Sequence, residues 1–172
     1  ILISALGKIE DVRLAITMDV KNEGDLIYIL GKTFNELGGS EYFNHINYIG
    51  NNVPKVNALK AKKLYQDIHK AIKQKLVNSC HDISDGGLGV CLAEISLAGG
   101  LGIEIDLSKV PVSKIENDTT ILFSETPSRF VITIPNNNKE KFEKILAENI
   151  IAEIGKVTNS NKLVIKGLKG NI

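Results

Sequence analysis

The sequence predicts an α+β fold in which helices pack on a mixed, mostly antiparallel sheet. Short apolar runs have the length and composition of strands, and longer segments repeat apolar residues at helical spacing. The predicted strands outnumber the roughly three predicted helices, and the two types do not alternate strictly along the chain. Strict alternation would favour a parallel sheet, so its absence favours the α+β class.

Each predicted strand is a short apolar or alternating run. Ile9–Val20 alternates in part, and Leu26–Leu30 is a continuous apolar run that suits a buried strand. The other predicted strands are Val77–Ser84, Leu101–Leu107, Thr119–Phe123, Phe130–Ile134, Ile150–Val157 and Leu163–Ile165. We expect the last two to pair around a turn at Asn159–Asn161. Thr33–Asn52 lacks clear periodicity and is predicted to be a loop with one helical turn near Tyr42.

Three helices are predicted, at Asn57–Leu76, Gly87–Ala98 and Lys139–Asn149. The first is the clearest, because apolar residues recur at spacings of three and four and form one stripe. Lysines fill most of its other positions, at Lys60, Lys62, Lys63, Lys70, Lys73 and Lys75. No aromatic or arginine pattern accompanies them, so we interpret this face as solvated rather than as a patch for a polyanion.

Composition limits the class of protein. The chain has 172 residues, a net charge of +1 and 43% hydrophobic residues, which suits one globular domain without a disulfide or metal staple. The balanced charge excludes nucleic-acid binding driven by bulk electrostatics, and no apolar run is long enough for a membrane span. We expect no signal peptide. The sequence begins at Ile1 inside an apolar run, which we interpret as a cut from a longer chain.

The two cysteines predict neither a disulfide framework nor a metal cluster. Cys91 lies in an apolar helical pattern, where a free cysteine acts as a small hydrophobe. Cys80 is followed by His81, but neighbours on a strand point to opposite faces, which argues against a nucleophile–base dyad. Reduced cysteines and the expected lack of a leader favour the cytoplasm.

His81–Leu88 is the densest candidate site, with a strand, a glycine turn and a helix start in succession. Its candidate residues are Asp82, Ser84, Asp85, Gly86 and Gly87. Paired glycines and the free N–H groups of a helix start could bind an anion, although two aspartates would repel a bare phosphate. A Mg²⁺ ion held by Asp82 and Asp85 would remove that conflict. The alternative is structural: Ser84 or Asp85 caps the helix and the glycines only form the turn.

Two further segments are candidates. Ser124–Arg129 places Ser124, Glu125 and Arg129 on a polar connection between strands. Arg129 would either contact a phosphate or carboxylate or pair with Glu125 across the turn. The other segment, Gly38–Tyr42, contains Gly38, Gly39, Ser40 and Glu41 and is a weaker candidate for a ligand loop. The sequence lacks a Walker loop, a dinucleotide fingerprint, a zinc motif and a serine triad.

The three candidate segments together resemble a known family. Leu37–Tyr42, His81–Leu88 and Leu122–Arg129 occur in the same order in phosphoribosylformylglycinamidine synthases, and the chain looks like the C-terminal part of their synthetase subunit II. The resemblance extends to Ile154–Thr158. It implies a fold similar to the C-terminal domain of aminoimidazole ribonucleotide synthetase, loosely ferredoxin-like. It also implies that residues 1–20 are the tail of a preceding domain and residues 21–172 the C-terminal domain.

The resemblance implies an ATP-dependent carbon–nitrogen ligase of purine biosynthesis. ATP would phosphorylate the amide oxygen of formylglycinamide ribonucleotide, and glutamine-derived ammonia would displace the phosphate. The implied cofactors of the full-length enzyme are ATP and Mg²⁺. The implied partners are the subunit's N-terminal domains, a glutaminase subunit and a small third subunit, with no nucleic acid and no membrane.

The family's catalytic histidine, Mg²⁺ ligands and most ATP contacts have no counterpart here, so no catalytic residue is predicted and this chain alone is expected to be inactive. By analogy the three candidate segments would line a phosphate-binding surface or an auxiliary nucleotide site. The alternatives are another synthetase or kinase of the superfamily, or a structural and interaction domain without its own ligand site.

Overall fold

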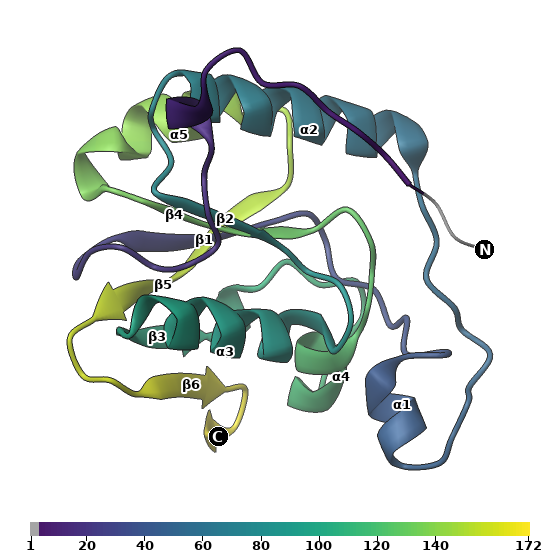
Figure 1. Ribbon diagram of the computed structural model, residues 1–172. Coiled ribbons are helices and arrows are strands. Elements are labelled where there is room, and N and C mark those ends of the chain that lie inside the picture. The colour runs from purple at the N-terminus through teal and green to yellow at the C-terminus, as the bar shows by residue number, and fades with distance from the viewer. Residues whose placement is uncertain (1–3) are drawn as a thin grey trace.

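A computed structural model describes residues 4–172, and Figure 1 shows a sheet with helices on both of its faces. The strands are β1 (Leu26–Leu30), β2 (Ser79–Asp82), β3 (Gly102–Asp106), β4 (Phe130–Ile134), β5 (Ile151–Thr158), β6 (Leu163–Gly167) and β7 (Gly170–Asn171). Their order is β2–β4–β1–β5–β3–β6–β7, and all neighbours are antiparallel except β3 and β6. The predicted α+β fold with a mostly antiparallel sheet is confirmed.

Most of the helices lie in two layers, one on each face of the sheet (Figure 1). They are α1 (Glu41–His45), α2 (Ala58–Lys73), α3 (Gly87–Gly99), α4 (Asp118–Phe123) and α5 (Lys139–Ile145), with 3₁₀ turns at Val12–Leu14, Leu107–Lys109 and Asn136–Asn138. In Figure 1, α2 and α5 cover one face of the sheet and α3 and α4 the other. Between residues 4 and 172, no helix has both the length and the apolar character needed to cross a membrane.

The centre of the fold is a βαββαβ unit. It consists of β1, α2, β2, β4, α5 and β5, whose strands have the order β2–β4–β1–β5. This is the arrangement of a ferredoxin-like motif. The segment with α3, β3 and α4 is inserted between β2 and β4, and it builds the second helical layer. The inserted segment is therefore what gives the sheet a second buried face.

Burial on both faces explains the continuous apolar run of β1. Ile27 and Ile29 belong to the core under α3 and α4, whereas Tyr28 and Leu30 belong to the core under α2 and α5. All four are at most 1% exposed. A strand covered on both sides needs apolar residues at every position rather than at alternate ones.

The helix α2 follows its predicted stripe. Asn57 caps its N-terminus, where the side-chain oxygen accepts a hydrogen bond from the N–H of Lys60 at 3.1 Å. The buried apolar residues of this helix are Ala61, Leu64, Ile68 and Ala71, at helical spacing. The six lysines that were predicted to lie on the surface are all exposed.

The predicted strand at Thr119–Phe123 is wrong, because these residues form helix α4. Asn117 caps this helix, and its side-chain oxygen accepts a hydrogen bond from the N–H of Thr120 at 2.8 Å. Asp118 adds a favourable acidic residue in the first turn. The local capping signal therefore outweighs the β-propensity of the following residues.

Two other strand predictions need correction. Ile9–Val20 is not a strand. The Asp11 side chain accepts a hydrogen bond from the N–H of Arg13, and the chain forms a 3₁₀ turn there. The carbonyl of Thr17 accepts a hydrogen bond from the N–H of Cys80 on the edge strand β2, but no further ladder is formed between these two segments in the described part of the chain. β5 and β6 do not pair with each other, because β3 lies between them and bonds to both.

The two cysteines are structural, as predicted, and they lie in different cores. Cys91 is a buried residue of α3 in the core between this helix and the sheet, and the half-buried Cys80 packs against the core under α2. Burial raises the pKa of Cys80 to about 11, with a smaller contribution from the charge of Asp82. Burial raises the pKa of Cys91 further. A thiol reacts as its thiolate, so both should be inert at neutral pH.

We predict slow thiol labelling of the folded protein by dithionitrobenzoate at pH 8. With a pKa of about 11, only about 0.1% of Cys80 is thiolate at that pH. Both cysteines should react at once in denaturant, and Cys80 should react before Cys91 as the pH rises. Labelling of the native chain at the denatured rate would contradict this prediction.

Candidate functional site

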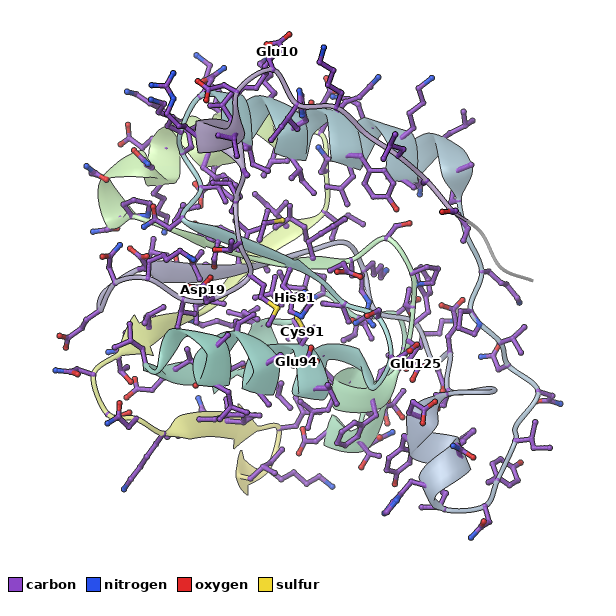
Figure 2. All side chains as sticks on the ribbon, in the orientation of Figure 1. Glu10, Asp19, His81, Cys91, Glu94 and Glu125 are labelled. Carbon is purple, nitrogen blue, oxygen red and sulfur yellow. The ribbon has the colours of Figure 1, made fainter. Side chains whose placement is uncertain are left out.

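The three predicted segments meet at one carboxylate. Glu125 Oε1 accepts a hydrogen bond from the N–H of Glu41 at 2.9 Å and from the N–H of Gly86 at 2.8 Å. These donors lie at the start of α1 and of α3. Figure 2 shows Glu125 between the beginning of α3 and α1. A single side chain therefore joins loops that are separated by about 40 residues or more along the chain.

Arg129 holds the segment that carries Glu125. The side chain is 1% exposed, and its guanidinium donates three hydrogen bonds inside the protein. Nε bonds to the carbonyl of Thr126 at 2.8 Å, Nη1 to Thr33 Oγ1 at 2.9 Å, and Nη2 to the carbonyl of Ser124. The guanidinium thus closes the turn from residue 124 to residue 129 and ties it to the end of β1.

Both predictions for Arg129 are therefore wrong in this structure. The guanidinium has no exposed surface for a phosphate, and its hydrogen bonds go to Thr33, Ser124 and Thr126 rather than to Glu125. Burial lowers its pKa to about 10, while the nearby carboxylates of Glu36 and Glu125 favour the charged form. Arg129 stays protonated at neutral pH and acts as a positioning residue.

Gly87 allows α3 to begin against the end of α4. Its φ of +68° lies in the left-handed region, and an added Cβ would come within 2.6 Å of the carbonyl oxygen of Leu122 and 2.8 Å of that of Ser124. Gly86 is the N-cap residue, and no side chain of the described residues caps α3 there. The alternative in which Ser84 or Asp85 caps this helix is therefore wrong.

The hydroxyl groups of the site are used inside the protein. Ser40 is buried, and its Oγ caps α1 by accepting a hydrogen bond from the N–H of Phe43 at 3.2 Å. Ser124 is buried too, and its Oγ accepts a hydrogen bond from the N–H of Glu36 at 3.3 Å. Gly38 is also buried, and Asn52 lies against it. These three residues are therefore buried supports of the site and do not belong to its exposed surface.

The exposed part of the site is acidic. Glu41, Asp82 and Asp85 are exposed together with Gly39 and Ser84. Such a surface repels a bare phosphate and suits a hard cation or a cation–phosphate complex. Within residues 4–172, no group of three or more His, Cys, Asp or Glu side chains could hold a metal ion by itself. Asp82 and Asp85 would need oxygen ligands from a phosphate or from another protein surface.

Glu36 is a residue that the sequence reasoning missed. It is 6% exposed, and its Oε2 has no hydrogen-bond partner within the described part of the chain. Its backbone joins the site, since its carbonyl accepts a hydrogen bond from the N–H of Glu125 at 3.2 Å. The available signal was an acidic residue directly before the apolar–glycine run Leu37–Gly39, in a segment without periodicity.

His81 lies beside this surface and links β2 to α3. Its Nε2 is 2.9 Å from Glu94 Oε2, and its Nδ1 is 3.4 Å from Asp82 Oδ1. Figure 2 shows His81 and Glu94 facing each other, with Cys91 nearby. The imidazole is thus paired with carboxylates rather than with the Cys80 thiol, in agreement with the prediction that these neighbours form no dyad.

We predict that Arg129→Met destabilises the protein by about 3 kcal/mol or more, because three buried acceptors lose their donor. The matched control is Arg13→Met, since Arg13 is the only other arginine and pairs with Asp11 on the surface. That exposed pair should contribute less than about 1 kcal/mol. Chemical denaturation measures both; equal stabilities of the two variants would contradict the role given to Arg129.

The sequence is similar to those of known proteins. The chain is 39% identical over 155 residues to the phosphoribosylformylglycinamidine synthase subunit PurL of Thermococcus sibiricus, which covers 90% of this chain and 21% of that protein. It is 37% identical over 157 residues to the subunit of the same name from Methanocaldococcus jannaschii, with 89% and 21% covered. The chain thus spans about a fifth of the length of these relatives.

Solved structures show the same fold. A Thermotoga maritima PurL complexed with FGAR superposes with a TM-score of 0.81 at 17% identity, covering 94% of this chain and 28% of that one. The E. coli hydrogenase maturation protein HypE superposes with a TM-score of 0.67 at 21% identity, covering 92% and 51%. Residues 22–167 match the family model described as "AIR synthase related protein, C-terminal domain", and the chain therefore belongs to this family.

Proposed function

We propose that this chain is a domain of a phosphoribosylformylglycinamidine synthase, an ATP-dependent carbon–nitrogen ligase of purine biosynthesis. The relatives that carry this name support the proposal. In the proposed reaction, ATP phosphorylates the amide oxygen of formylglycinamide ribonucleotide, and ammonia then displaces the phosphate to give the amidine. The domain supplies none of the covalent chemistry, and this chain alone is inactive.

The observation that carries the proposal is the convergence of the three segments on Glu125. The exposed carboxylates of Glu41, Asp82 and Asp85 would face a magnesium–nucleotide complex. Mg²⁺ prefers a few carboxylate oxygens together with phosphate oxygens and water, which fits this incomplete donor set. Bound there, the ion would neutralise phosphate charge. The role of this chain's residues is to hold the acidic loops in place.

The partner domains and subunits, and the cytoplasmic location, belong to the same proposal. The N-terminal domains of the subunit would supply the catalytic groups, and a glutaminase subunit with a small third subunit would deliver ammonia in the cytoplasm. Residues 1–20 would be the tail of a preceding domain. In support, a solved neighbour is described as the PurLQS complex of Thermotoga maritima.

A second candidate function is interaction with a neighbouring domain of the same polypeptide. The segment from Ile46 to Leu59 exposes large apolar side chains, namely Ile46, Tyr48, Ile49, Val53, Val56 and Leu59. The glycine pair holds its first half in place, because Gly38 N–H bonds to Asn52 O at 2.9 Å and Gly39 N–H to Ile49 O at 2.7 Å. Apolar groups gathered in this way mark a contact surface. The relatives are about five times longer and would supply the covering domain.

Titration calorimetry separates the two functions. We predict that Mg²⁺ strengthens the binding of ATP to this chain relative to EDTA, because the acidic surface binds the nucleotide only through the cation. Asp85→Asn should abolish this gain in affinity from Mg²⁺, whereas Glu140→Gln, which removes an exposed charge on α5, should not. Formylglycinamide ribonucleotide with ammonia and ATP should give no product.

The opposite results have distinct meanings. An ATP affinity that Mg²⁺ does not raise would contradict the nucleotide role of the acidic surface and leave the interaction domain as the function. Amidine formation by this chain alone would contradict the proposal that the catalytic groups lie in other domains.

A further inference from the structure

A cavity of about 580 Å³ opens at the N-terminal end of α2. It lies between the start of this helix, Lys32 and Phe34 after β1, and Thr126–Ser128. It shares no lining residue with Gly38–Glu41 or Asp82–Gly87. The segment that Arg129 closes therefore has two sides: Glu125 joins the acidic loops, and residues 126–128 form a wall of this cavity. Its volume is in the range that holds a small molecule.

The cavity concentrates positive charge in a nearly neutral protein. Four of its lining residues are lysines, at positions 32, 55, 60 and 63, and Glu148 is its only acidic lining residue. Lys63 is already paired, at 2.7 Å from Asp67 and 3.1 Å from Glu148. The other three lysines form no ion pair within residues 4–172. Three lysines of the lining thus have no ion-pair partner in the part of the chain that the structure describes.

The start of α2 adds to the positive electrostatic potential of the cavity. The helix is 16 residues long, and its N-cap residue Asn57 lines the cavity together with Leu59, Lys60 and Ala61 of its first turn. The N-terminal end of a helix carries a partial positive charge that favours anions. The Asn57 side chain binds the N–H of Lys60, so this end is well formed before any ligand arrives.

The cavity also has an apolar wall. Phe34 is 43% exposed, with the Lys32 ammonium 5.9 Å from its ring centre, and Leu59 is 84% exposed. Pro127 and Ile150 complete the wall. Exposed apolar groups beside unpaired lysines suit a ligand that has an anionic end and an apolar or planar body.

We propose that this cavity binds a phosphorylated small molecule, with the phosphate on Lys32, Lys55 and Lys60 and the body against Phe34 and Leu59. The binding needs no metal, because the site itself supplies the positive charge. In this it differs from the acidic loop surface, where a cation is required. The two sites can therefore be tested separately, and failure at one leaves the other untouched.

The test measures AMP binding to the chain by calorimetry in EDTA. We expect saturable binding, weakened roughly tenfold in Lys60→Gln, because a charge-assisted contact to phosphate is lost. Lys62→Gln is the matched control, since it makes the same change on an exposed residue of the same helix outside the cavity. Its affinity should stay within about twofold of the parent. Glu148→Gln should bind AMP several-fold more tightly, a gain that a misfolded variant cannot produce.

Pyrophosphate and adenosine test the two halves of the site. AMP should bind more tightly than either, because each lacks one half of the interaction. No saturable AMP binding at millimolar concentration, or an equal loss in Lys60→Gln and Lys62→Gln, would overturn the proposal. Pyrophosphate binding as tight as that of AMP would overturn the assignment of the apolar wall.

Discussion

A buried guanidinium holds the functional end of this domain together. Arg129 ties the carbonyls of Ser124 and Thr126 to Thr33 at the end of β1. This fixes Glu125, whose carboxylate holds the starts of α1 and α3. Burying a charge is costly unless its hydrogen bonds are made, and here all three guanidinium nitrogens have an acceptor. The arrangement behaves as one unit, because removing the guanidinium leaves several buried groups unpaired at once.

The same turn separates two surfaces of opposite charge. On one side, Glu41, Asp82 and Asp85 form an acidic surface that suits a cation–phosphate complex. On the other side, Lys32, Lys55 and Lys60 line a cavity that suits an anion directly. The near-zero net charge of the chain does not reveal that the acidic and basic residues lie on separate surfaces. Local potentials, rather than the net charge, decide which small ligands such a domain can bind.

The sequence predicted the parts of the fold that depend on local pattern. β1, β4 and α2 were found because their apolar residues are continuous or at helical spacing. The strand order was not predicted. β3 lies between β5 and β6 and pairs with both, and these pairings join residues that are far apart in the sequence. The three candidate segments were identified, but the role of Arg129 was not: a charged residue in a polar run is expected to face solvent, and only the packed fold reveals its burial.

The most direct test of this account is hydrogen exchange of the backbone amides of Glu41 and Gly86. In Glu125→Ala, both amides should exchange about ten- to a hundredfold faster than in the parent, because both lose the same acceptor, while amides of β1 and β4 keep their protection. Glu116→Ala, at an exposed position, should change neither. Unchanged protection of Glu41 and Gly86 in Glu125→Ala would contradict the claim that one carboxylate joins the three loops.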